Sequence, residues 1–382
     1  MNRTGHTRRD YLLILIFTLL SVGLYFLPTG FAEKVDTDAV RCTGKVLAVD
    51  NSELQNLGLI RKGEQGVTLD ILDGPFKGQT FDANNQLLGQ LDRDKIFRPG
   101  DEAYVIISVD ENGKPIYVNP QDHYRLRLEL ILLLLFAFLV FAFGGATGLK
   151  ALLSFVFTGL VLWKVMIPLL LKGVDPLILV MGIVSLLCAV IIYLVAGVNR
   201  VGTTAFFGAF LGVLTSCVLG IYFTHALHVH GAVMPFAETL LYSGYSHLNL
   251  VQIFIAAVFL ASSGAFMDLA MDVAASMGEI AAHSPEISRG QLIRSGLRVG
   301  RAVVGTMTTT LLLAYSGGYV TLLMAFMAQG IPLDSTFNFI YVAAEVLKTL
   351  VGSFGLVTVA PFTAVVGGML LAGRRSAVTS QG

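Results

Sequence analysis

The clearest pattern in the chain is a series of long apolar stretches separated by short polar segments, which begins after Arg125. Five of these stretches approach the roughly twenty residues that an α-helix needs to cross the hydrocarbon of a bilayer. They are residues 128–146, 152–171, 176–197, 203–223 and 250–270. One more apolar run follows Arg3, Arg8 and Arg9 at the N-terminus, and the poor cleavage site behind it favours a retained membrane helix over a cleaved signal peptide.

The C-terminal apolar region is harder to divide. Residues 302–330 are too long for one span and are interrupted by Gly317 and Gly318. Residues 340–373 carry Glu345 and Lys348 near their start, which predicts a short interfacial or re-entrant helix followed by a final span. The total is therefore about eight, or else ten, transmembrane or re-entrant helices.

A polar segment between the first two apolar runs follows a different period. Short runs alternate apolar and polar residues, which is the two-residue period of a β-strand. Asn112 and Gly113 stand between two such runs, a pair typical of a tight hairpin turn. We expect about five strands that form a small β-barrel or sandwich, OB-like in size.

These elements give the fold class, which is a polytopic α-helical membrane protein with a small extracytoplasmic β-rich domain. Its parts are residues 1–32, a basic N-terminus and first membrane helix, residues 33–122, the β-domain, and residues 123–382, the multi-pass helical domain. Lys and Arg in short loops mark the cytoplasmic side. The basic N-terminus, Arg200, residues 289–301 and Arg374 with Arg375 are therefore expected inside, and residues 33–122 outside.

Composition agrees with the membrane assignment. Hydrophobic residues make up 54% of the 382-residue chain and charged residues only 14%, where a soluble domain has about 25% charged residues. The net charge of zero gives no sign of a nucleic-acid partner. Three cysteines without a spacing pattern indicate neither a disulfide framework nor a zinc site.

Two aspartates lie at the end of the last of the five apolar stretches, Asp268 inside it and Asp272 just beyond it. Gly264, Asp268, Asp272 and Ser276 recur every four residues, so they share one face of a helix. Downstream, three arginines with spacings of four and three share a face of the next predicted helix: Arg294, Arg298 and Arg301. The acidic and basic stripes form either a structural charge zipper, with Arg294 and Arg298 as ion-pair candidates, or a polar lining for a ligand, because ionisable residues in membrane segments are often functional.

Other polar residues have weaker signals. Thr308 lies in a threonine-rich continuation of the arginine helix, where hydroxyls either bond to their own helix or line a pore. Glu345 and Lys348 are three residues apart and can neutralise each other. His225, His228 and Glu238 are weak candidates for a metal site, because the histidine spacing does not place them all on one helical face.

Several blocks of the sequence resemble the YibE/F family of bacterial multi-pass membrane proteins. They are "SGAFMDLAMDVAASMGEI", "SGLRVGRAVVGTMTTTLLLAYSGG" and "EVLKTLVGSFGLVTVAPFTA". The likeness extends from the β-rich segment to the last span. The chain departs from the family pattern at Arg298, Ala302 and Thr309. The resemblance implies a multi-pass protein of a bacterial cytoplasmic (inner) membrane, and it implies little about mechanism.

Two classes of function fit these observations. The first is a secondary transporter or permease for a small solute or ion, with proton or cation coupling through Asp268 and assistance from Asp272. Arg301 would be the counter-charge or an anion contact. Thr308 and Glu345 would line the path. The second is a non-transporting membrane scaffold or envelope-assembly protein whose β-domain binds a partner.

Enzymatic activity is not expected. Motifs of metalloproteases, serine hydrolases and nucleotide-binding proteins are missing from the sequence. An intramembrane lipid-modifying enzyme is the remaining enzymatic alternative, but no nucleophile or metal set accompanies the acids. We therefore expect no cofactor. The expected partners are the lipid bilayer and a small solute or ion, and a homo-oligomer is left open.

Overall fold

The computed structural model describes residues 8–31 and 39–372. Arg3, Arg374 and Arg375, used above to predict orientation, lie outside the described residues, as do residues 33–38 of the predicted β-domain. The chain divides into two compact units, one of residues 30–139 and one of residues 1–29 with 140–382.

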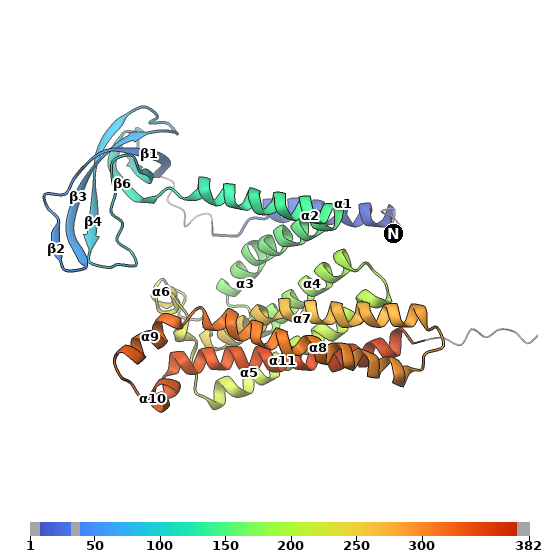
Figure 1. Ribbon diagram of the computed structural model, residues 1–382. Helices are drawn as coiled ribbons and strands as arrows, with labels where there is room; N and C mark the ends of the chain where they lie inside the picture. Colours follow the sequence, from blue (N-terminus) through green and yellow to red (C-terminus); the bar gives the residue numbers. More distant parts are fainter. Residues whose placement is uncertain (1–7, 32–38, 373–382) are drawn as a thin grey trace, which may run out of the picture. The chain divides into compact units, whose positions relative to one another are not determined.

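The first unit is a β half-barrel of antiparallel strands (Figure 1). Its strands follow the order β2-β3-β1-β5-β6, and β4 pairs with β3. Alternate residues are buried along each long strand, as the two-residue period predicts; on β5 these are Ala103, Val105 and Ile107. The strand bounds are β1 (Ala39–Asp50), β2 (Gln55–Leu57), β3 (Ile60–Ile71), β4 (Thr80–Leu88), β5 (Glu102–Val109) and β6 (Pro115–His123).

The hairpin between β5 and β6 is wider than a two-residue turn. Only Gly113 has a positive φ, of 74°, whereas Asn112 keeps a negative one. The carboxylate of Asp110 accepts hydrogen bonds from the backbone N–H groups of Asn112 and Lys114. Because Asp110 satisfies these donors, the turn needs a left-handed residue at Gly113 alone.

A buried amide network fixes the loop between β4 and β5. Gln65 is fully buried on β3, and its Nε2 donates to the carbonyl of Phe97 at 3.0 Å. Its Oε1 accepts from the backbone N–H of Phe97 at 3.0 Å and from Asn85 at 3.1 Å. One side chain thus satisfies both backbone groups of Phe97, whose ring fills the core of the half-barrel.

The second unit is helical. Its buried core lies mainly between α4, α5, α7, α8 and α11, four of which run beside one another (α5, α7, α8 and α11 in Figure 1). The helix bounds are α1 (Arg8–Phe26), α2 (Leu126–Val161), a π-turn η2 (Leu162–Met166), α3 (Ile167–Leu171), α4 (Pro176–Val195), α5 (Arg200–Ala226), a 3₁₀ turn η3 (Gly231–Val233), α6 (Ala237–Tyr242), α7 (Leu250–His283), α8 (Arg289–Ser316), α9 (Val320–Ala328), α10 (Leu333–Asn338) and α11 (Ile340–Leu370). The beginning of α2 belongs to the first unit.

Within the described residues, five helical segments are long and apolar enough to cross a membrane, and a sixth if α8 and α9 form one bent span. The break between α8 and α9 falls at Gly317 and Gly318 as predicted, and the two helices meet at 67°. Residues 126–171 form one helical run with non-helical angles at Gly145, where the sequence predicted two spans. The count of about eight, or ten, stays a prediction.

The C-terminal region corrects one expectation. Instead of a re-entrant helix followed by a span, α11 is a single helix of 31 residues with Pro361 inside it. Glu345 and Lys348, both mostly buried, pair with each other one turn apart on this helix, so their charges do not interrupt it. The apolar sequence on either side can then continue the same helix.

Small residues allow α5 and α11 to approach closely. A Cβ atom on Gly212 would meet Val359, and one on Gly355 would meet Ser216. The hydroxyl of Ser216 donates to the carbonyl of Val351 at 3.1 Å across the same contact. Close backbone approach through small residues is the usual way in which membrane helices associate.

Candidate functional site

The aspartate stripe lies on α7. This helix begins behind Asn249, whose side chain accepts a hydrogen bond from the backbone N–H of Gln252 at 3.1 Å and caps the helix. One face of α7 is buried among the other helices, with Phe266, Val273 and Met277 fully enclosed. With 34 residues, α7 is longer than the roughly twenty residues that one membrane span needs.

Asp268 and Asp272 occupy the opposite, exposed face of α7. Gly264 is exposed one turn before them, and a Cβ atom there would meet nothing within 4 Å. Within the described residues, neither carboxylate accepts a hydrogen bond or forms an ion pair. The structure thus presents two unpaired acids on an apolar helix.

The arginine stripe lies on α8, as predicted, behind a capping box made by Ser288 and Gln291. Arg294, Arg298 and Arg301 are exposed. In the described part of the chain, no ion pair joins these arginines to Asp268 or Asp272. The charge zipper, one of the two alternatives from the sequence, is therefore not formed among the described residues of one copy.

A pair of hydroxyl groups, one on the buried Ser262 and one on the half-buried Tyr315, joins α7 to the C-terminal end of α8. The Oγ of Ser262 lies 2.9 Å from the hydroxyl oxygen of Tyr315, and a Cβ atom on Gly352 of α11 would meet Ser262. The sequence analysis missed this contact. The sequence held one signal for the position of Tyr315 on α8. It follows Arg294, Arg301 and Thr308 at intervals of seven residues, and residues at this spacing point in nearly the same direction from the helix.

Thr308 is half-buried, and its hydroxyl donates to the carbonyl of Val304 at 3.1 Å. Thr306 and Thr310 bond to their own helix in the same way. The donors of these hydroxyls are therefore used locally, and the threonine cluster of α8 is not aimed at a common point.

Glu345 does not join the aspartates. Lys348 Nζ lies 2.6 Å from Glu345 Oε1, and both side chains are mostly buried. The same ammonium group lies 5.6 Å from the centre of the Phe254 ring on α7. These contacts neutralise Glu345 on α11.

The histidine candidates lie at the end of α5. His225 and His228 line a pocket of about 530 Å³ with Thr224, Asn249 and other residues of α5 and α7. Glu238 lies on α6 and does not line this pocket. Among the described residues, no group of three or more His, Cys, Asp or Glu side chains is arranged to hold a metal ion.

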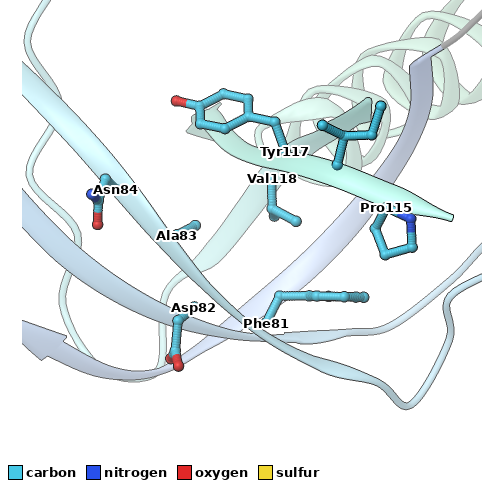
Figure 2. Close-up of a pocket in the computed structure, with 8 residues that line it drawn as sticks. Phe81, Asp82, Ala83, Asn84, Pro115, Tyr117 and Val118 are labelled. Carbon is cyan, nitrogen blue, oxygen red and sulfur yellow. The ribbon is translucent and has the colours of Figure 1, made fainter. Parts of the chain in front are cut away.

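A groove in the half-barrel is a further candidate that the sequence did not indicate. It has a volume of about 390 Å³ and lies between β4 and β6, which pair with β3 and β5 but form no ladder with each other (Figure 2). Ala83 and Val118 are buried along it. Figure 2 shows the side chains of Asp82 and Tyr117 pointing away from each other, and both are exposed.

Residues 132–373 match the model of a family described as YibE/F-like protein. The chain belongs to the YibE/F-like family. The match confirms the resemblance seen in the sequence blocks around Asp268 and Arg301. It begins inside α2, so it covers most of the helical unit of this YibE/F-like protein and leaves α1 and the half-barrel outside. No match was found among curated proteins or among solved structures.

Proposed function

We propose that this YibE/F-like protein is a secondary transporter of a small solute or ion, coupled to protons or another cation through Asp268. The observation that supports it is the exposed carboxylate of Asp268 on an apolar helix, with no basic partner in the described chain. An acid in such a place is costly unless it binds a cation or a proton. It therefore has the chemistry of a coupling site.

The proposal includes a membrane arrangement. The N-terminus and the α7–α8 turn lie in the cytoplasm and the half-barrel outside, in a bacterial inner membrane, with eight or ten helices in all. If α7 enters the membrane near Leu250, twenty residues bring it to Asp268 and Ala270 at the inner boundary. Asp268 then meets both hydrocarbon and water, where a cation can enter and leave.

Glu345 and Thr308 have smaller parts in this proposal than the sequence suggested. Glu345 is paired with Lys348, and Thr308 bonds to its own helix. Asp272 and Arg301, which are exposed on the neighbouring helices α7 and α8, set the charge around Asp268 instead.

The test is proton movement in proteoliposomes that contain the full chain and trapped pyranine. Gradients of Na⁺, K⁺, Mg²⁺, phosphate and mixed amino acids are imposed one at a time. We expect at least one of them to drive proton movement, and Asp268→Asn to abolish it. Glu279→Gln, which changes another exposed acid of α7, is the matched control and leaves the movement intact. Equal proton movement in Asp268→Asn and wild type would contradict the proposal.

The groove between β4 and β6 favours a second candidate, a membrane scaffold whose half-barrel binds a partner. Two strand edges that form no ladder with each other can take up an added strand. The two functions separate in one comparison. If the protein is a scaffold, Asp268→Asn leaves binding of the partner unchanged. Charged residues in place of Ile116 and Tyr117, which are exposed on β6, then abolish that binding.

A further inference from the structure

We infer that two copies of this chain pair through the outer face of α7 and α8, with Asp272 of each copy against Arg301 of the other. This goes beyond the proposed transport function and does not depend on it. The starting observation is that acids and arginines are exposed on neighbouring antiparallel helices and form no ion pair within the described chain. Charges of both signs are thus left without partners on one side of the helical unit.

The two stripes lie on the same side of the helix pair. Tyr315 contacts Ser262 on α7, and Arg301 is fourteen residues, two heptads, before Tyr315 on α8. Residues at this spacing keep nearly the same direction, with a drift of about 20° per heptad. Arg301 therefore points toward the α7 side of α8 while remaining exposed, as Asp272 is on α7.

The heights of the charges also match. Asp272 is eleven residues before the end of α7 at His283, or about 17 Å along the helix. Arg301 is twelve residues after the start of α8 at Arg289, or about 18 Å. Since a short turn joins the two helices, Asp272 and Arg301 are level with each other.

A two-fold symmetric dimer would bring Asp272 of one copy to Arg301 of the other. A two-fold axis parallel to the helices keeps both copies in the same membrane orientation, and it preserves the height of every residue. It also places α7 of one copy opposite α8 of the other, because rotation exchanges the two sides of the face. Asp272 of each copy then meets Arg301 of its partner, twice in the dimer, as an isologous interface requires.

The residues between the charges fit a close helix contact. Exposed positions on this face are small: Ala261, Gly264 and Ala275 on α7, and Ala302 and Gly305 on α8. Cβ atoms on Gly264 and Gly305 would meet nothing within 4 Å, unlike those on the glycines of the α5–α11 contact. Small residues with no neighbour inside one copy fit a contact supplied by a second copy.

The test uses full-length copies with two different tags, expressed together and purified through both tags in sequence. Asp272→Arg alone and Arg301→Asp alone each place like charges at both contacts, and we expect the yield of doubly tagged complex to fall at least about tenfold. Mixing one Asp272→Arg copy with one Arg301→Asp copy restores opposite charges at both contacts and restores the yield. A pair within one chain could not be rescued by mixing, so failure of the mixture to recover while Asp272→Arg/Arg301→Asp in one chain does recover would overturn the inference.

A second pair of variants keeps the test valid if reversed charges disturb folding. A copy with Asp272→Cys and a copy with Arg301→Cys, oxidised in the membrane, form a disulfide between copies if the faces meet. The control replaces the second copy by Val357→Cys, which is exposed on α11, and gives no cross-link. Equal cross-linking in both mixtures, or none in either, would overturn the inference whatever the result of the flux assay.

Discussion

Lys348 Nζ lies 2.6 Å from Glu345 Oε1, one turn away on α11, and above the ring of Phe254 on α7. Two charges that the sequence placed at the edge of a membrane segment thus cancel inside the helical unit. The pair lets α11 continue as one helix. Among the described residues, Glu345 thus has a counter-charge, whereas Asp268 and Asp272 on α7 do not.

Removing one partner of this pair should destabilise the helical unit. In Glu345→Gln, Lys348 keeps its charge but loses its counter-charge, and we expect the free energy of unfolding to fall by about 1 to 3 kcal/mol. The double variant Glu345→Gln/Lys348→Met should lose less than the sum of the two single variants, because no charge is left unpaired. Thermal unfolding in one detergent measures all four proteins, and strictly additive losses would show that the pair contributes nothing.

The contact between α5 and α11 depends on the absence of a side chain at Gly212. Gly212→Ala puts a Cβ atom against Val359, and we expect a loss of about 1 to 3 kcal/mol. Gly182→Ala on α4 is the control, because a Cβ atom there meets nothing within 4 Å. It should gain about 0.5 to 1 kcal/mol from the better helix propensity of alanine. Equal shifts of Tm in the two variants would argue against close packing at Gly212.

The amide of Gln65 should hold the loop of residues 89–98 in place. Gln65→Met leaves the N–H and the carbonyl of Phe97 buried without partners, at a cost of about 2 to 4 kcal/mol. We expect faster cleavage by trypsin at Arg93 and Lys95 in the full-length protein. Gln86→Met, an exposed change on the adjacent strand, should cleave at the wild-type rate.

The same loop should loosen in acid. Burial works against the charged form of Asp94, but the backbone N–H groups of Leu88, Gly89 and Gln90 donate to its carboxylate and hold its pKa below the usual range. A lowered folded pKa gives stability that is present above the unfolded pKa of about 3.9 and is lost as pH falls through the folded value. Amide exchange at residues 88–90, corrected for the intrinsic rate, should rise only in that range. Asp94→Asn should remove the pH dependence, and a rise already near pH 6 would contradict this assignment.

Much of the fold follows from period and composition. The two-residue alternation located the β-unit, and the apolar runs located the long helices. Both patterns can be read from the sequence because the side chains that one element buries recur at a fixed interval along the chain. The capping box at Ser288 and the break at Gly317 and Gly318 were also found, because each depends on neighbours in sequence. The continuity of α11 was not, since charges at Glu345 and Lys348 look disruptive until their pairing is known.

The candidate site was predictable in its residues and not in its contacts. The spacing of Asp268 and Asp272 placed both on one face of α7, where they lie. Whether the arginines of α8 reach them depends on how far the two helices rotate about their axes, which packing against α11 decides. The Ser262–Tyr315 contact was not predicted, because the seven-residue spacing that ends at Tyr315 does not identify a partner 53 residues away in the chain.

The central claim is that Asp268 is an accessible carboxylate without a basic partner at the membrane boundary. Its most direct test is labelling of the full-length protein in native membranes with dicyclohexylcarbodiimide, followed by peptide mass spectrometry. This apolar reagent reacts with protonated carboxyl groups. We predict that Asp268 is modified, that its labelling falls as pH rises, and that Glu345 is protected by Lys348. Modification of Glu345 with Asp268 left unlabelled at every pH would contradict the account.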